Sequence, residues 1–353
     1  MTITLGSLFD GIGVFPLAAS RHGINPVWAS EIIPDAISIT KRHFPEMLHL
    51  GDITKLDGGK IPAVHVIAFG SPCQNLSQIG NKTGLNGAKS SLFYQAIRII
   101  EEMRDASGGL YPAIAVWENV VGAMLSSDKR DYLAVLKSFA GTEVSMPDSG
   151  QWADAGVVRG RRCDLAWRVL DAQYWSNPKL ARRERIFVVA DFTGQRAAEI
   201  LFNTRSMHTD SRLCSASGLS AAEDRRDAAF EAGRQVPVIL PFYGFKMRGA
   251  AANRNRQQFI RSFGKRTDVF PTILASEQTA FAYYYEDDPL AGCIRYPTEA
   301  ESERLMGLPP DWTKYGADGE EIRSSSRYAA LGNSVALPCA EYIMEGIAEA
   351  LQK

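Results

Sequence analysis

The sequence predicts an α/β fold in which a doubly wound, mostly parallel sheet is joined to a smaller, irregular domain. Short apolar strands alternate with helical stretches through the first half of the chain, and this rhythm is typical of a parallel sheet. A glycine-containing turn follows the first strand, and after residue 191 the chain becomes polar and Arg-rich without a βα rhythm. We therefore expect one domain of residues 1–191 plus 325–353, and a second of residues 192–324.

The elements were assigned in chain order from apolar periodicity and turn residues. Strands are expected at 2–8, 26–30, 46–49, 63–69, 113–117 and 185–191. Helices are expected near 14–22, 34–43, 91–105, 128–139, 163–171 and 338–351. Residues 141–162 read as a long surface loop, 218–233 as a helix of unclear position, and 297–308 as a helix opened by a Thr-Glu capping box.

Composition narrows the class of protein. The chain has 353 residues, 45% of them hydrophobic and 22% charged, with a net charge of -1. Its five cysteines are widely spaced without a CxxC pair, which argues against a disulfide framework or a zinc site and favours a reducing cytoplasm. We see neither a signal peptide nor an apolar run of membrane-spanning length. Contact with nucleic acid would need a local basic patch.

Cys73 lies in the turn Gly70-Ser71-Pro72-Cys73-Gln74, directly after the apolar run 64–69. Open parallel sheets carry out their chemistry at the carboxyl ends of strands, so a thiol held there beside proline is placed as a nucleophile. The alternative is that Cys73 is a small buried hydrophobic residue, as free cysteines often are.

The first βα turn contains Phe9, Gly11 and Gly13, where glycines allow a ligand to approach the backbone closely. Pro16 replaces the third glycine of a dinucleotide fingerprint, which disfavours a pyrophosphate ligand. Glu31, twenty residues after Gly11, is placed to bind two ribose hydroxyls.

Asp52 and Ile53 follow the third strand and could meet an adenine amino group and ring face. Adenosine without pyrophosphate indicates S-adenosylmethionine as cofactor. The alternative is a purely structural turn followed by a solvated Glu31.

Three further groups lie at predicted strand or helix ends. Glu118 follows the apolar strand 113–117 and is expected to donate to a ring nitrogen, unless it is a solvated or capping residue. Arg183 and Arg185 enter the strand 185–191, where they orient a base and phosphates or form a solvated edge. The Gly332-Asn333-Ser334 turn offers donors for a carboxylate before the last helix.

Residues 242–267 form a basic segment without any acidic residue. Aromatic, Asn and Gln side chains are interleaved with its positive charges. Positive charge binds phosphates, and Arg, Asn and Gln can read base edges. A charge run is often only a solvated face, but this composition favours DNA binding, with candidate residues Lys246, Arg248, Arg254, Arg256 and Arg261.

These motifs occur in a fixed order: SLFDGIG, Glu31, Asp52, GSPCQNLS, SSLFY, ENV, RRERIF, TEAESERLMGLP and GNSVALP. In order and spacing the chain resembles the C5-cytosine DNA methyltransferases of bacteria and their phages. The resemblance covers residues 1–191 and 295–353, and it implies a Rossmann-like, S-adenosylmethionine-binding domain and a variable target-recognition domain between these stretches.

The resemblance also implies residue roles. Cys73 attacks C6 of a cytosine swung out of duplex DNA, Glu118 binds N3 and the exocyclic amine, and Arg183 and Arg185 orient the base. The residues implied for the cofactor shell are Phe9, Gly11, Gly13, Glu31, Ile32, Asp52, Ile53, Asn333 and Ser334.

Three positions depart from the family pattern, which usually has Asp at Ser7, an aromatic residue at Ser71 and Gln at Ala181. Because Ala181 lacks the amide of Gln, the local support of Arg183 is changed. None of the departures falls on Cys73, Glu118 or the two arginines, so we expect an active enzyme.

The sequence leaves two other functions open: a C5-cytosine methyltransferase acting on transfer RNA, and a catalytically silent DNA-binding regulator. For the favoured function we expect a cytoplasmic monomer that acts on duplex DNA without a metal. A cognate restriction endonuclease would place it in a restriction-modification system.

Overall fold

The structure is a computed structural model that describes residues 2–72, 92–125, 129–175, 181–202, 270, 272–275 and 296–353. Four short strands between 242 and 295 are described by their backbone alone. The chain divides into two compact units. Unit 1 comprises Met1–Leu170, Glu184–Arg205 and Cys339–Lys353, and unit 2 comprises Asp171–Arg183 and Ser206–Pro338. The assignment of catalysis and cofactor binding to residues 1–191 plus 325–353, and of target recognition to residues 192–324, stays a prediction.

Unit 1 is built on an eight-stranded sheet of order β3-β2-β1-β4-β5-β8-β7-β6. Its first five members pair in parallel, whereas β8 runs antiparallel to β5 and β6 antiparallel to β7. The strands are β1 (Thr4–Leu8), β2 (Asn25–Ser30), β3 (Leu48–His49), β4 (Val66–Phe69), β5 (Ile114–Val120), β6 (Ala155–Arg159), β7 (Asp164–Asp171) and β8 (Glu184–Asp191). This confirms the predicted mostly parallel, doubly wound sheet.

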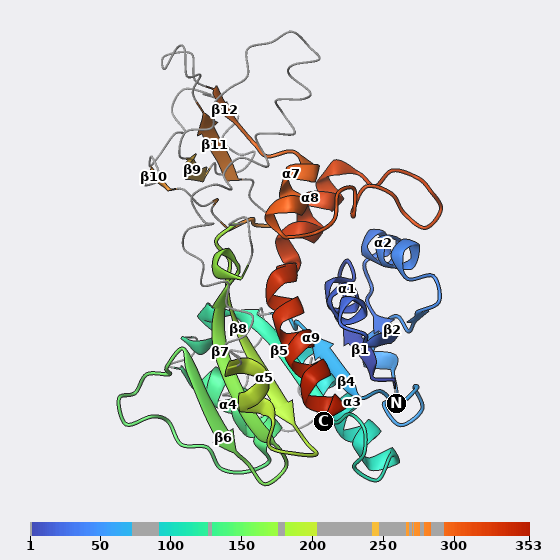
Figure 1. The fold of residues 1–353 in the computed structure, drawn as a ribbon, viewed down its shortest axis with the longest axis vertical. Coiled ribbons are helices and arrows are strands. Elements are labelled where there is room, and N and C mark those ends of the chain that lie inside the picture. Colours follow the sequence, from blue (N-terminus) through green and yellow to red (C-terminus); the bar gives the residue numbers. More distant parts are fainter. Residues whose placement is uncertain are drawn as a thin grey trace. The chain divides into compact units, whose positions relative to one another are not determined.

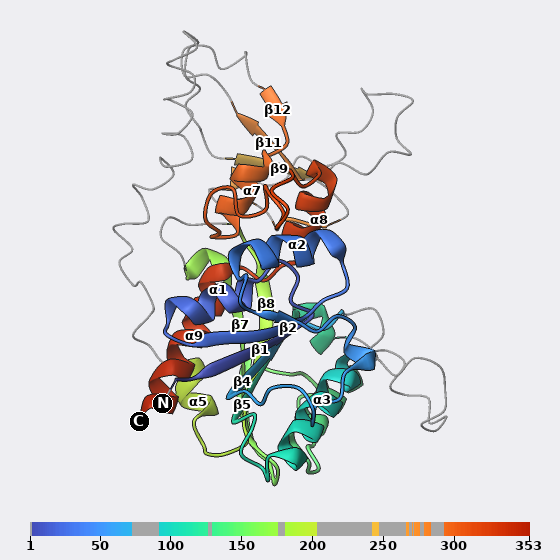
Figure 2. The same cartoon turned by 90° about the vertical axis from the view of Figure 1, so that its right-hand side faces the viewer.

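Helices cover both faces of this sheet. Figures 1 and 2 show α1 and α3 on opposite sides of the parallel strands. The helices of unit 1 are α1 (Val14–Arg21), α2 (Pro34–His43), α3 (Leu92–Ala106), α4 (Arg130–Ala140), α5 (Ala197–Phe202) and most of α9 (Leu337–Gln352). No helix of the described residues is both long and apolar enough to cross a membrane.

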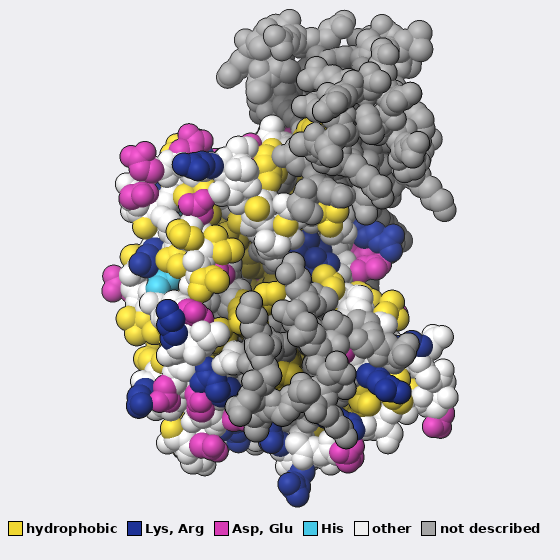
Figure 3. All heavy atoms as spheres, turned by 180° about the vertical axis from the view of Figure 1, so that it is seen from behind, with side chains coloured by type: hydrophobic (Ala, Val, Ile, Leu, Met, Phe, Trp, Pro, Cys, Tyr) yellow, Lys and Arg dark blue, Asp and Glu magenta, His cyan; other side chains and the backbone are white. Residues whose placement is uncertain are grey.

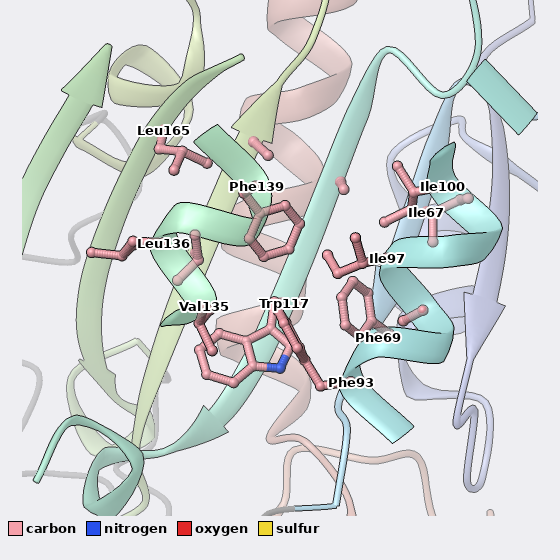
Figure 4. Close-up of a cluster of buried hydrophobic side chains, with 14 of the residues drawn as sticks. Ile67, Phe69, Phe93, Ile97, Ile100, Trp117, Val135, Leu136, Phe139 and Leu165 are labelled. Atoms are coloured by element: carbon pink, nitrogen blue, oxygen red, sulfur yellow. The ribbon is translucent and has the colours of Figure 1, made fainter. Parts of the chain in front are cut away.

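The hydrophobic core on the α3 and α4 side is rich in aromatic residues. Phe93 on α3 makes edge contacts with Trp117 on β5 and with Phe139 on α4, at ring-centroid distances of 5.7 and 5.9 Å. Figure 4 shows Ile97 of α3 and Leu136 of α4 in the same cluster. Large buried aromatic surfaces of this kind contribute strongly to stability.

Two of the sequence predictions about this unit were wrong. Residues 163–171, predicted as a helix, form β7 (Asp164–Asp171), and the predicted loop 141–162 contains β6 (Ala155–Arg159). A short apolar run fits either a buried strand or a helix, and tertiary pairing decides between them. Here Gly156 lies opposite Trp167, where a Cβ would come within 2.2 Å of the indole ring, so the glycine makes room for this cross-strand contact.

In its described residues, unit 2 has a four-stranded antiparallel sheet of order β10-β9-β11-β12 and the helices α7 (Glu299–Leu305) and α8 (Ser324–Asn333). The strands are β9 (Phe242–Lys246), β10 (Arg266–Thr267), β11 (Thr279–Tyr283) and β12 (Cys293–Arg295). The predicted capping box is confirmed at the start of α7, with Thr298 as N-cap and Glu301 returning a hydrogen bond. The segment 218–233 lies outside the described residues.

Candidate active site

Three parallel strands of unit 1, β1, β2 and β4, end in a common row, and β5 passes through the same row. Leu8 of β1 is in register with Ser30 of β2 and with Phe69 of β4, and Phe69 is in register with Trp117 of β5. The next residue on each strand is a predicted functional or loop residue, namely Glu31, Phe9, Gly70 and Glu118. Neighbouring strands are about 4.8 Å apart, and three such spacings separate β2 from β5. The Cα atoms of Glu31 and Glu118 are therefore about 14 Å apart along the carboxyl end of the parallel strands. Glu31, the start of the first turn and Glu118 therefore lie along the same end of the sheet.

The carboxylate of Glu118 forms an ion pair with the guanidinium of Arg185 on β8, with 3.0 Å between Oε1 and Nε. The antiparallel register of β5 and β8, in which Val120 lies opposite Arg185, makes this contact possible. The pair is partly buried, with side-chain exposures of 11% and 15%. A Cβ on Gly70 would lie 3.0 Å from Glu118 Oε2, so the glycine lets the chain pass directly beside the acid.

The loop stem, which we define as Gly70, Ser71 and Pro72, is fastened by the two residues that flank Glu118. The indole Nε1 of Trp117 donates to Ser71 Oγ at 3.0 Å, and Asn119 Nδ2 donates to the Ser71 carbonyl at 3.1 Å. Cys73, the predicted nucleophile, comes directly after this stem and lies outside the described residues.

The first βα turn has the backbone that its glycines predict. Phe9, Gly11 and Gly13 have φ angles of 53°, 60° and 77°, in the left-handed region that glycine adopts most readily. A Cβ on Gly11 would meet nothing within 4 Å, whereas one on Gly13 would come within 3.2 Å of Thr40. The turn is therefore open on the Gly11 side and packed against α2 on the Gly13 side.

Glu31 fixes this turn to the end of β2. Its Oε2 accepts the backbone N–H of Gly11 at 2.9 Å, and its Oε1 accepts those of Ile32 and Ile33 at 2.6 and 2.9 Å. A carboxylate has about four acceptor positions, so three amide donors leave capacity for a further hydroxyl. The Ile32 side chain is 68% exposed, which is unusual for a large hydrophobic residue and suits the face of a planar ligand.

Asp52 and Ile53 have local roles after β3. Asp52 caps the short 3-10 helix Ile53–Lys55, because its Oδ1 accepts from both the backbone and the hydroxyl of Thr54. These hydrogen bonds hold the pKa of Asp52 below its ordinary value. Ile53 is 4% exposed and packs in the hydrophobic core, so its side chain has the surroundings of a packing residue.

A carboxylate that the sequence analysis did not single out lies inside the same turn. Asp10 is 8% exposed, and its Oδ2 accepts from the Thr40 hydroxyl of α2 at 3.2 Å. Burial raises the pKa of Asp10 to about 7, and the nearby charge of Glu31 adds to the rise. Asp10 therefore links the turn to α2 instead of facing the open side.

Arg183 belongs to unit 2 and has surroundings different from those of Arg185. It is 1% exposed, and its guanidinium donates to the carbonyls of Ile273, Gly332 and Ser334. These are contacts of a residue that positions the backbone, and the base-orienting role implied for it stays a prediction. The turn it holds contains Asn333, which is exposed, and Ser334, whose hydroxyl donates to the Val335 carbonyl.

The predicted DNA-contacting side chains lie outside the residues whose side chains are described. Lys246 ends β9, which is described by its backbone alone, and Arg248, Arg254, Arg256 and Arg261 fall in gaps. Over the described surface drawn in Figure 3, basic and acidic side chains are interspersed. That surface differs from the acid-free composition of residues 242–267, whose role in binding DNA stays a prediction.

A family model for C-5 cytosine-specific DNA methylases matches residues 3–227. The chain belongs to this family. Over 350 aligned residues it is 24% identical to a type II methyltransferase of Bacillus subtilis (strain 168), covering 97% of this chain and 75% of the relative. The Dnmt2 methyltransferase structure of S. pombe has a TM-score of 0.62 at 17% identity, covering 99% of this chain and all of that chain. The structural likeness confirms the Rossmann-like methyltransferase fold.

A relative from Escherichia phage P1 is named DNA N-6-adenine-methyltransferase. It is 25% identical over 465 aligned residues, which cover 98% of this chain. This chain spans only 61% of the length of that relative, so an activity named for the whole relative does not transfer directly.

The sequence analysis did not identify Trp117 and Asn119, which hydrogen-bond to the loop stem, or the buried Asp10. Trp117 and Asn119 sit at alternate positions of β5 around Glu118, and side chains at i and i+2 point to the same face of a strand. That alternation was visible in the sequence. Their common partner, Ser71, depends on the pairing of β4 with β5, which no local pattern specifies.

Proposed function

We propose that the protein transfers a methyl group from S-adenosylmethionine to C5 of a cytosine flipped out of a specific duplex DNA sequence. The observation that carries this proposal is the common strand row, which brings Glu31 and the Gly11 turn to the same sheet edge as the Glu118–Arg185 pair and the stem before Cys73. Carboxyl ends of parallel strands are the usual place for a ligand in such sheets.

The residues of the first turn fit S-adenosylmethionine. Glu31 has acceptor capacity for ribose hydroxyls, Ile32 offers an exposed apolar face, and Gly11 is open on one side. When bound, the cofactor supplies an electrophilic methyl group. Phe9, Gly13, Asp52 and Ile53 are proposed to contribute to the same cofactor site, and Asn333 and Ser334 are proposed to contact the cofactor.

In the proposed reaction the Cys73 thiolate adds to C6 of the cytosine, and the C5–C6 π electrons move toward C5. Glu118 binds N3 and the exocyclic amine, and Arg185 holds the Glu118 carboxyl in place. With S-adenosylmethionine bound, C5 would take the methyl group as the sulfonium S–CH3 bond breaks and S-adenosylhomocysteine leaves. A water acting as base would then remove the C5 proton, and the electrons of that C–H bond would re-form the C5–C6 double bond as the Cys73 thiolate departs. The protein supplies the nucleophile. It also stabilises the charge that develops in the transition state, and this stabilisation is the largest single contribution to catalysis in many enzymes.

The attack requires access from above the base plane, which stacked neighbours block in a duplex. Extruding the base costs a few kcal/mol. Phosphate contacts from the basic segment 242–267 are proposed to offset this cost.

Bisulfite sequencing of DNA from cells that express the protein tests the activity and the target together. Methylated cytosines within one sequence context are expected, and they should be absent with Cys73→Ser. A duplex containing 5-fluorocytosine, which blocks loss of the C5 proton, should trap the wild-type chain covalently. A chain that leaves DNA unmethylated and untrapped would be a silent binder, and transfer of tritiated methyl groups to transfer RNA alone would identify an RNA enzyme.

A further inference from the structure

We propose that the hydrogen bond between Trp117 Nε1 and Ser71 Oγ is a positioning device for the nucleophile, a role specific to the residues present in this chain. This inference rests on the proposed function, because it concerns the step in which Cys73 bonds to the base. Both partners are described residues of unit 1, and both are buried, at 0% and 5% exposure.

The bond fixes the loop stem at a point very close to the nucleophile along the chain. Two trans peptide units allow at most about 7.6 Å between the Cα atoms of residues 71 and 73. Pro72 has a nearly fixed φ angle, and it restricts the residue before it to extended conformations. With the Ser71 side chain held, few torsions remain that can change the start of the loop.

The same bond ties the stem to the acid that must meet the same base. Trp117 and Asn119 both bind Ser71, one through its hydroxyl and one through its carbonyl, and Glu118 lies between them on β5. Gly70 passes beside Glu118 Oε2 on the other side of the stem. The stem and Glu118 are therefore held as one unit, and their separation depends on these contacts.

Ser71 and Trp117 also depend on each other chemically. The family usually has an aromatic residue at position 71, which lacks the short hydroxyl that Ser71 places on its Cβ beside Trp117. Without Ser71 Oγ, the indole N–H of Trp117 would be left buried without this acceptor, which is costly. Trp117 is stacked at 6.4 Å on Tyr132, so the ring cannot easily turn to another acceptor.

The test measures the rate of covalent capture by duplex DNA containing 5-fluorocytosine in the sequence that bisulfite sequencing returns. We expect Ser71→Ala to slow capture about tenfold, which corresponds to about 1.4 kcal/mol. Ser71→Thr keeps the hydroxyl and should restore most of the rate. The dissociation constant for S-adenosylhomocysteine should stay within about twofold of wild type, since the Gly11 turn is on a different strand.

Trp117→Phe is the complementary variant, and Trp167→Phe is its matched control. Trp167 is also buried on the sheet, and its Nε1 donates to the Ala153 carbonyl at 3.0 Å. Both changes should lower the melting temperature, but only Trp117→Phe should slow capture. The double variant Ser71→Ala/Trp117→Phe should be no slower than the slower single variant, because both remove the same bond.

Equal capture rates for Ser71→Ala and wild type would overturn this inference and leave the proposed function intact. So would additive losses in the double variant, or equal slowing by Trp167→Phe. A wild-type chain that is not captured at all would overturn the proposed function, and this inference with it.

Discussion

Two carboxylate–arginine ion pairs, one in each unit, have almost the same distance between their charged atoms but differ in exposure. Glu118 and Arg185 are 3.0 Å apart, and Glu303 and Arg327 are 3.1 Å apart. In unit 2 the pair is closed by Thr313, whose hydroxyl accepts from Arg327 Nε and donates to Glu303 Oε1. In unit 1, Glu118 Oε2 lies beside Gly70, which has no side chain, near the row where β1, β2 and β4 end.

The difference in exposure separates an almost fully buried pair from the pair that we propose for catalysis. Glu303 is fully buried, and its Oε1 receives donors from Arg327 and from both the backbone and hydroxyl of Thr313. Such an arrangement is costly to break because the remaining charge stays buried. Glu118 keeps a side-chain exposure of 11%, which the proposed contact with a base requires. The distance between the charged atoms does not distinguish the two pairs, whereas their exposure does.

The largest expected effect is on catalysis and concerns the Glu118–Arg185 pair. Glu118→Gln keeps the shape of the side chain but removes the acid, so methyl transfer to DNA should fall about 10²–10³-fold, or about 3–4 kcal/mol. Its stability in urea should change little. Glu101→Gln, in the exposed pair with Arg162, is the control and should keep full activity. A fully active Glu118→Gln protein would remove the distinction between the two pairs.

The closed pair should respond in stability instead. Arg327→Met leaves Glu303 buried without its cation, and we expect a loss of about 3 kcal/mol in the free energy of unfolding. Lys137→Met is a control at the exposed pair with Glu143, where a change of at most about 1 kcal/mol is expected. Urea denaturation measures both. A loss at Arg327 no larger than at Lys137 would show that the closed network is not a stabilising one.

Asp10 shows what burial does to a carboxylate held by hydroxyls without an arginine, since its pKa is raised to about 7. Between about pH 4 and pH 7 the unfolded chain gives up this proton while the folded chain keeps it, so stability should fall as the pH rises through that window. The part due to Asp10 between pH 5 and pH 8 is about 2 kcal/mol.

Asp10→Asn removes that titration. The stability difference between Asp10→Asn and wild type, measured by urea denaturation, should move in favour of the variant from pH 5 to pH 8. Asp57→Asn is the control, because Asp57 is exposed and its pKa is lowered chiefly by a hydrogen bond from Lys60. A difference between Asp10→Asn and wild type that does not vary with pH would mean that Asp10 is already ionised at pH 5 in the folded chain.

The sequence predicted the parts of this molecule that depend on local chemistry. The βα rhythm and the Thr298–Glu301 capping box both come from residues close together in the chain, and the structure confirms them. Glu31 and Glu118 were singled out because each follows a predicted strand, and their functional roles stay predictions.

What the sequence could not predict depends on register between distant segments. The pairing of Glu118 with Arg185 requires β8 to run antiparallel to β5, although the expected sheet was mostly parallel. Residues 163–171 became a strand because β6 was available to pair with them. The different partners of Arg183 and Arg185, only two residues apart, follow from the chain passing between units at residue 184. None of these can be read from a pattern within ten residues.

The smallest expected effect tests whether the closed pair depends on its helix. Glu303 is carried by α7, whose first turn is fixed by the Thr298 hydroxyl accepting from the backbone of Glu301. Thr298→Ala removes this cap and should cost about 1 kcal/mol in the free energy of unfolding, with methyl transfer unchanged. Thr298→Ser keeps the capping oxygen and should stay close to wild type. The double variant Thr298→Ala/Arg327→Met shows whether the two contributions are linked. If Arg327→Met costs no further stability when Thr298 is already Ala, the ion pair forms only on an intact α7. If the two losses add, the pair and the cap stabilise unit 2 independently.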